Sequence, residues 1–84
     1  MTRFEEAVKL IAEEYKEDCA EYDYTIKELF KCWQFDGEDM KEEFLFILND
    51  KFDGEFTDDC EIVDDDGNIK TFKQLTKAVK NYQF

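Results

Sequence analysis

Histidine, serine and proline are all absent from the 84-residue chain, and Arg3 is its only arginine. Without histidine or serine, the usual nucleophile–base pairs of hydrolases and transferases cannot be assembled. No glycine-rich loop is present to cradle a phosphate chain. Many carboxylates are available for acid–base chemistry, yet no pair stands out from the others. We therefore predict that the protein is not an enzyme, has no catalytic residues and binds no cofactor.

Cysteines and metal ligands are also sparse. Cys19, Cys32 and Cys60 are too widely spaced to predict a disulfide framework or a tetrahedral zinc site. Residues 64–69 share part of the spacing of a calcium-binding EF-hand loop. However, Lys73 occupies the twelfth position, where a bidentate glutamate is required. We predict no metal site.

Long apolar runs are missing as well. The sequence contains no secretory leader pattern and no apolar stretch of about 18 residues. We therefore expect no membrane contact, a cytoplasmic location and reduced thiols.

Acidic residues dominate what is present. The chain holds 23 Asp and Glu against 11 Lys and Arg, giving a formal net charge of −12 at pH 7. This charge disfavours direct contact with nucleic acid or anionic lipid. Aromatic residues make up 17% of the chain, which is enough to build a core, since each buried ring removes roughly 150–250 Å² from water. Residues 1–84 are predicted to form a single acidic globular domain.

Three Thr-x-x-Glu/Gln segments, starting at Thr2, Thr25 and Thr71, each precede a helical apolar pattern. In such a capping box, the side chains at both positions satisfy free amides of the first turn. A further helix is predicted from about Asp36 to a stop at Gly54. The apolar residues of the four helices recur at intervals of three and four. These buried stripes are Phe4, Val8, Ile11, Tyr15, Cys19 and Tyr22; Ile26, Leu29, Phe30 and Trp33; Met40, Phe44, Ile47, Leu48 and Phe52; and Phe72, Leu75, Val79 and Tyr82.

Before the last helix, the apolar period shortens to two residues. Cys60 and Ile62 alternate with acidic residues, and the chain returns as a second strand at residues 68–71. Asp66-Gly67 is typical of a type I′ turn, in which both central residues have positive φ. The sequence therefore predicts an α+β, mainly helical fold of about four helices, with one short antiparallel β-hairpin inserted before the last helix.

Carboxylates cluster in three stretches of the sequence. Glu13, Glu17 and Glu21 recur every four residues, with Glu14 and Asp18 beside them, and two further clusters cover residues 36–43 and 58–66. On a rigid scaffold, such rows can imitate the phosphates of DNA coarsely. The candidate partner-binding residues are Glu13, Glu17, Glu21, Glu42, Glu43, Asp58, Asp59 and Asp65.

Some aromatic residues fall off the stripes, and we expect them either to pack under the hairpin or to form a contact surface. They are Tyr24, Phe35, Phe46, Phe56 and Phe84.

The end of the chain reverses the sign of the charge. The first 67 residues hold 7 basic and 23 acidic groups, a net charge of −16, whereas the last 17 hold four lysines and no acid. Lys73, Lys77 and Lys80 share one helical face, and Lys70 precedes them. This strip is interpreted either as a small binding site for phosphate or acid, or as internal charge balance. The second interpretation is favoured.

In size and charge, though in no specific motif, the chain resembles the small acidic inhibitors encoded by phages and mobile elements. Anti-restriction, anti-CRISPR and glycosylase-inhibitor proteins are examples. The resemblance implies a non-enzymatic inhibitor that blocks a basic nucleic-acid-binding protein by charge mimicry, with aromatic side chains adding buried contact. The alternatives are an acidic adaptor or assembly protein, which in one form is a homodimer joined through the third helix, and an immunity or antitoxin protein acting by protein–protein contact.

Overall fold

The computed structural model describes residues 1–34, 37–52, 56 and 59–84. Within these ranges it contains five helices and one two-stranded antiparallel sheet, so the predicted mainly helical α+β fold is confirmed. The elements are α1 (Arg3–Glu14), α2 (Lys16–Tyr22), α3 (Ile26–Cys32), α4 (Gly37–Phe52), β1 (Ile62–Val63), β2 (Ile69–Lys70) and α5 (Phe72–Lys80). No helix in the described ranges is long and apolar enough to cross a membrane.

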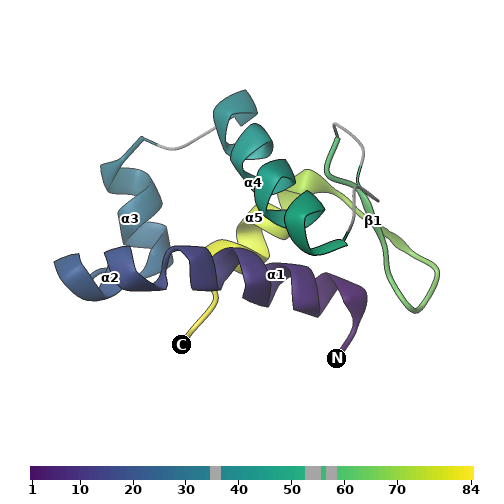
Figure 1. Cartoon of the computed structure of the whole chain (residues 1–84), viewed down its shortest axis with the longest axis horizontal. Helices are drawn as coiled ribbons and strands as arrows, with labels where there is room; N and C mark the ends of the chain where they lie inside the picture. Colours follow the sequence, from purple (N-terminus) through teal and green to yellow (C-terminus); the bar gives the residue numbers. More distant parts are fainter. Residues whose placement is uncertain (35–36, 53–55, 57–58) are drawn as a thin grey trace.

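Helices α1 and α2 run nearly in line along the long axis of the molecule (Figure 1). Helix α3 turns back from the end of α2, α4 rises above α1, and α5 lies behind them. The hairpin occupies the opposite end from α2 and α3, beside the start of α1. The acidic helices α1 and α2 and the lysine-bearing helix α5 are therefore packed on one core.

All three predicted capping boxes are present. The hydroxyls of Thr2, Thr25 and Thr71 accept hydrogen bonds from the amides three residues later, at 3.1, 3.2 and 3.3 Å. The side chains at those later positions accept in return from the threonine amides, at 3.4, 2.9 and 2.8 Å. Each box pairs amides that would otherwise remain free in the first turn, which is why α1, α3 and α5 begin where the sequence predicts.

The prediction of about four helices is one too few, because the helix expected through Tyr22 is interrupted at Tyr15. Tyr15 has φ −102° and ψ 1°, and its N–H reaches the Ala12 carbonyl at 3.1 Å in a tighter turn. Helical bonding resumes at once, since the Cys19 N–H donates to the Tyr15 carbonyl at 2.9 Å. The two helices therefore form one slightly interrupted rod.

Helix α2 ends in a left-handed cap at Asp23, with φ 57° and ψ 42°. The Tyr24 N–H bonds to the Cys19 carbonyl at 2.9 Å, which is the closing bond of a Schellman motif. The chain leaves the core at this point. Tyr22, which the stripe places inside, is 52% exposed as a result, so that part of the prediction is wrong.

The core joins α1, α3, α4 and α5 through a chain of aromatic rings. Tyr15 meets Phe30 edge to face at 5.0 Å, Phe30 lies 6.3 Å from Phe44, and Phe44 lies 5.7 Å from Phe72. Such contacts add to the stabilisation from burial alone. Phe30 and Phe44 are almost completely buried, as are Leu75 and Val79 of α5. The predicted stripes of α4 and α5 are therefore confirmed, and that of α3 is confirmed except for Trp33.

At the hairpin end, Arg3 lies over two aromatic rings. Its guanidinium carbon is 5.6 Å from the Phe52 centroid and 5.7 Å from the Phe56 centroid. Phe56 is buried here. It therefore cannot contribute to an exposed contact surface. Of the two expectations for the off-stripe aromatics, packing or surface contact, Phe56 follows the first.

The hairpin turn differs from the predicted type I′ turn. The Asp64 N–H donates to the Asn68 carbonyl and the Gly67 N–H donates to the Asp64 carbonyl, both at 2.9 Å. These bonds close a three-residue loop, in which Gly67 has φ 83° and Asp66 does not have positive φ. Strands β1 and β2 pair Ile62 with Lys70 in antiparallel register. An Asp-Gly pair suits both loop lengths, so it predicts the hairpin but not the turn type.

Asp64 belongs to the third acidic cluster in sequence, yet its side chain is only 9% exposed. Its carboxylate accepts a hydrogen bond from the Phe4 N–H at 3.2 Å, so it pairs a free amide in the first turn of α1. Asp64 therefore stabilises the fold and does not belong to the acidic surface.

Two predicted helix ends and one aromatic residue lie outside the described residues. These are the start at Asp36, the stop at Gly54 and Phe35.

Candidate acidic interaction surface

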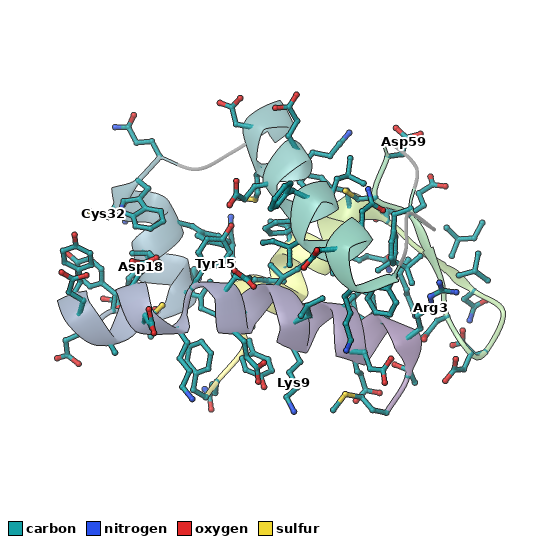
Figure 2. All side chains as sticks on the ribbon, in the orientation of Figure 1. Arg3, Lys9, Tyr15, Asp18, Cys32 and Asp59 are labelled. Atoms are coloured by element: carbon teal, nitrogen blue, oxygen red, sulfur yellow. The ribbon has the colours of Figure 1, made fainter. Side chains whose placement is uncertain are left out.

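The structure divides the seven candidate carboxylates that it describes between two regions of the molecule. Glu13, Glu17 and Glu21 are exposed on the α1–α2 rod, and Glu42 and Glu43 are exposed on α4. Asp59 and Asp65 are exposed at the hairpin end, and Asp58 lies outside the described residues. Figure 2 places Asp18 and Asp59 far apart, along a longest dimension of 37 Å. The prediction thus covers two separate acidic regions.

Carboxylates from three helices converge on Tyr15. Burial raises the pKa of Tyr15 far above its ordinary value of 10, and the negative charges of Glu43, Glu14 and Asp18 raise it further, in that order. Glu43 comes from α4, whereas Glu14 and Asp18 come from α1 and α2. We call Glu14, Asp18 and Glu43 the Tyr15 acidic cluster. It depends on tertiary packing, because Glu43 is remote from the other two in sequence.

A second group of carboxylates, Glu13, Glu17 and Glu21, forms what we call the outer acidic row. All three side chains are exposed, and the row spans about 12 Å at 1.5 Å per residue. Glu13 and Glu17 lie two positions on either side of Tyr15, which places them on nearly the opposite side of the rod from Tyr15. Glu14 and Asp18 lie between the row and the core. Between Glu13 and Glu21 the rod therefore carries five acidic residues, of which four are exposed and Asp18 is half-buried.

Exposed aromatic rings border these carboxylates. Trp33 is 41% exposed and its ring lies 6.4 Å from that of Tyr15. Tyr22 and Tyr24, 52% and 37% exposed, stack at 5.8 Å with an interplanar angle of 23°. Exposed aromatic rings thus lie close to Tyr15 and, at Tyr22, directly follow Glu21 in the sequence.

The sequence places Trp33 on a buried stripe, and this prediction is wrong. Helix α3 ends at Cys32, and Gln34 adopts a left-handed φ of 55°. Trp33 is the C-terminal cap of α3, and only part of its ring is covered. No local pattern predicts this exposure, because it depends on how far α3 extends. Among the off-stripe aromatics, Tyr24 is 37% exposed, and Phe46 and Phe84 are 78% and 57% exposed, so these three follow the expectation of an exposed contact surface.

The lysines at the end of the chain line a groove together with one lysine from a distant helix. Lys27 of α3 joins Lys73, Lys77 and Lys80 of α5 around a hollow of about 450 Å³. We call this the lysine groove. Within the described residues, none of these four ammonium groups forms an ion pair and no acidic side chain lines the hollow. The expected internal charge balance therefore involves no direct pairing in this part of the chain.

The cysteines remain separate thiols: Cys19 and Cys60 are buried, and Cys32 is exposed. The interpretation of Cys19 as a small buried core residue is confirmed. In the part of the chain that the structure describes, no group of three or more Cys, Asp or Glu side chains is arranged to hold a metal ion.

No protein-family model, curated protein or solved structure matches this chain. Its function must therefore be argued from the chemistry and geometry of its surfaces.

Proposed function

We propose that this protein is a non-enzymatic inhibitor that binds a basic nucleic-acid-binding protein in the cytoplasm and blocks its nucleic-acid channel. The acidic surface of α1, α2 and α4 would occupy the channel in place of phosphates. Such an inhibitor would suit a phage or mobile element that protects its DNA from the DNA-binding machinery of the host.

The observation that carries the proposal is the convergence of carboxylates from three helices beside half-exposed aromatic rings. The negative charges of Glu43, Glu14 and Asp18 all act on Tyr15, and the Trp33 ring lies 6.4 Å from the Tyr15 ring. Exposed charges alone mainly accelerate association and contribute little to holding a complex together. Buried aromatic anchors supply most of the affinity at protein interfaces. An acidic surface with aromatic edges provides both contributions.

The density of charge supports coarse mimicry of nucleic acid. Carboxylates of the outer acidic row are about 6 Å apart along the helix axis, whereas one DNA strand carries a charge about every 3.4 Å. The row therefore has roughly half the linear charge density of a single strand. A basic channel would attract it from a distance, and this attraction would weaken as salt shortens the screening length to about 8 Å at physiological ionic strength.

The first experiment is affinity capture from a host lysate at low salt, followed by salt elution and identification of the eluted protein. The purified target is then titrated with this chain while it holds labelled DNA or RNA. We expect stoichiometric displacement of the nucleic acid, with affinity falling steeply between low and high salt.

The control is a pair of variants with the same change in net charge. Glu13→Lys, Glu17→Lys and Glu21→Lys together reverse the outer acidic row. Glu6→Lys, Asp50→Lys and Glu61→Lys reverse three other exposed acids. We expect the first triple variant to weaken displacement by at least about tenfold and the second to have a much smaller effect. Equal effects would mean that net charge alone, and no particular face, drives binding.

The exposure of Phe46 favours one alternative function. This side chain of α4 is 78% exposed, which suits an adaptor or assembly protein that binds through an apolar contact. Binding of that kind is insensitive to salt and is lost on Phe46→Ala. Salt-resistant capture that depends on Phe46 would therefore replace the inhibitor proposal.

A further inference from the structure

The lysine groove is a site of opposite charge on a strongly acidic protein. Lys27, Lys73 and Lys77 are exposed, and Lys80 is half-buried. They come from two helices that are far apart in sequence but packed together. Four like charges around one hollow repel each other, and no ion pair within the described residues relieves that repulsion. An anion entering the groove would relieve it.

The remaining lining is chiefly apolar. Phe72 contributes its half-buried ring, and lysine side chains contribute methylene stems below their ammonium groups. The Thr76 hydroxyl already donates to the Phe72 carbonyl at 2.9 Å. The polar groups left for a ligand are the four ammonium groups and the Asn81 amide. A ligand that matches this lining has an apolar part and several negative charges.

The size of the groove selects small anions over large ones. Lys73 and Lys80 are separated by about 10 Å along α5 at 1.5 Å per residue. At physiological salt, charges farther than about 8 Å are largely screened. A small anion therefore experiences mainly the lysines, whereas a long polyanion extends over the acidic surfaces of a chain with net charge −12.

We propose that the lysine groove binds a small ligand that carries both a chain of phosphates and a flat aromatic ring, as a nucleoside triphosphate does. Lysine is a common phosphate ligand, acting as a compact positive charge. The ring would lie against Phe72 and the lysine stems. The site is separate from the acidic surface, so its test does not depend on the proposed inhibitor function.

The probe is magnesium-free ATP, titrated into the full chain labelled with ¹⁵N while amide shifts are recorded. Inorganic tripolyphosphate, a short single-stranded oligonucleotide and a glutamate-rich peptide are titrated in parallel. We expect saturable shifts with ATP at Lys27 and residues 73–81. Binding of the other three probes should be weaker. Tighter binding of the oligonucleotide or peptide than of ATP, or equal binding of tripolyphosphate, would overturn the proposal.

The groove is tested with Lys73→Gln and Lys77→Gln together, and the control is Lys9→Gln with Lys51→Gln. All four lysines are exposed, so both variants are expected to fold, which thermal unfolding checks. We expect the groove variant to weaken ATP binding by about tenfold and the control to leave it within about twofold. Equal weakening in both variants, or no saturable shift in the unmodified chain, would contradict the proposal.

Discussion

Helices α1–α2 and helix α5 pack on the same aromatic core, yet their outward faces carry charges of opposite sign. The rod presents the outer acidic row and part of the Tyr15 acidic cluster, whereas α5 presents three lysines of the lysine groove. The ring chain from Tyr15 through Phe30 and Phe44 to Phe72 connects the two sides. A net charge of −12 therefore includes two local surfaces of opposite sign, the outer acidic row and the lysine groove.

The difference shows what kind of partner each side suits. Acidic residues occur along most of the chain, so attraction to a large basic surface can extend over many of them. Four of the eleven basic residues line the lysine groove, so the attraction of the groove acts over a short range. We therefore propose a macromolecular partner for one side and a small ligand for the other, although both sides pack on the same buried rings.

The largest predicted effect is on the core that supports both charged surfaces. Phe44→Ala removes a fully buried ring that contacts Phe30 and Phe72. We expect a loss of about 3–5 kcal/mol in the free energy of unfolding, measured by urea denaturation. Phe46→Ala, two residues later and 78% exposed, is the control and should cost less than about 1 kcal/mol. Similar losses would contradict the core assignment.

A smaller effect on the free energy of unfolding distinguishes a structural acid, Asp64, from a surface acid, Asp65. Asp64→Ala leaves the Phe4 N–H without its carboxylate partner, and we expect a loss of about 1–3 kcal/mol in the free energy of unfolding. The neighbouring Asp65 is exposed, so Asp65→Ala should be nearly neutral. Asp64→Asn keeps an acceptor oxygen and should fall between them. If both alanine variants unfold at the same urea concentration, Asp64 does not support α1.

The smallest effect tests the convergence of carboxylates on Tyr15 through its pH dependence. The raised pKa of Tyr15 means that the unfolded chain loses this proton first, so stability falls as pH rises above about 10. Glu43→Gln removes one cause of the shift and should reduce that fall by about half a kcal/mol. Glu42→Gln removes one negative charge at the preceding residue and serves as the control. Unfolding midpoints at pH 9 and 11.5 measure the difference. If stability falls by the same amount between pH 9 and 11.5 in both variants, the charge of Glu43 does not act on Tyr15.

Local chemistry explains which parts of the fold could be predicted. A capping box needs only two side chains three residues apart, so Thr2, Thr25 and Thr71 mark their helices correctly. The apolar stripes of α4 and α5 follow from helical periodicity in the same way. These features involve residues within a few turns of each other.

The features that sequence reasoning missed depend on packing between distant segments. Asp64 supports α1 across 60 residues, and Lys27 joins the α5 lysines only because α3 packs on α5. Trp33 is exposed because α3 ends early. The sequence shows Glu14 and Asp18 beside the outer acidic row, but their meeting with Glu43 requires the fold. For these residues, residue type and spacing alone predict neither the contacts nor the exposure.

The central claim is that charges are sorted into ordered surfaces on a rigid scaffold. Paramagnetic relaxation of each backbone amide by a cationic and an anionic nitroxide of equal size tests it most directly. We predict enrichment of the cationic probe along residues 13–23 and near Glu43, and of the anionic probe at Lys27 and residues 73–81. The same ratio of the two probes at every surface amide would contradict the account.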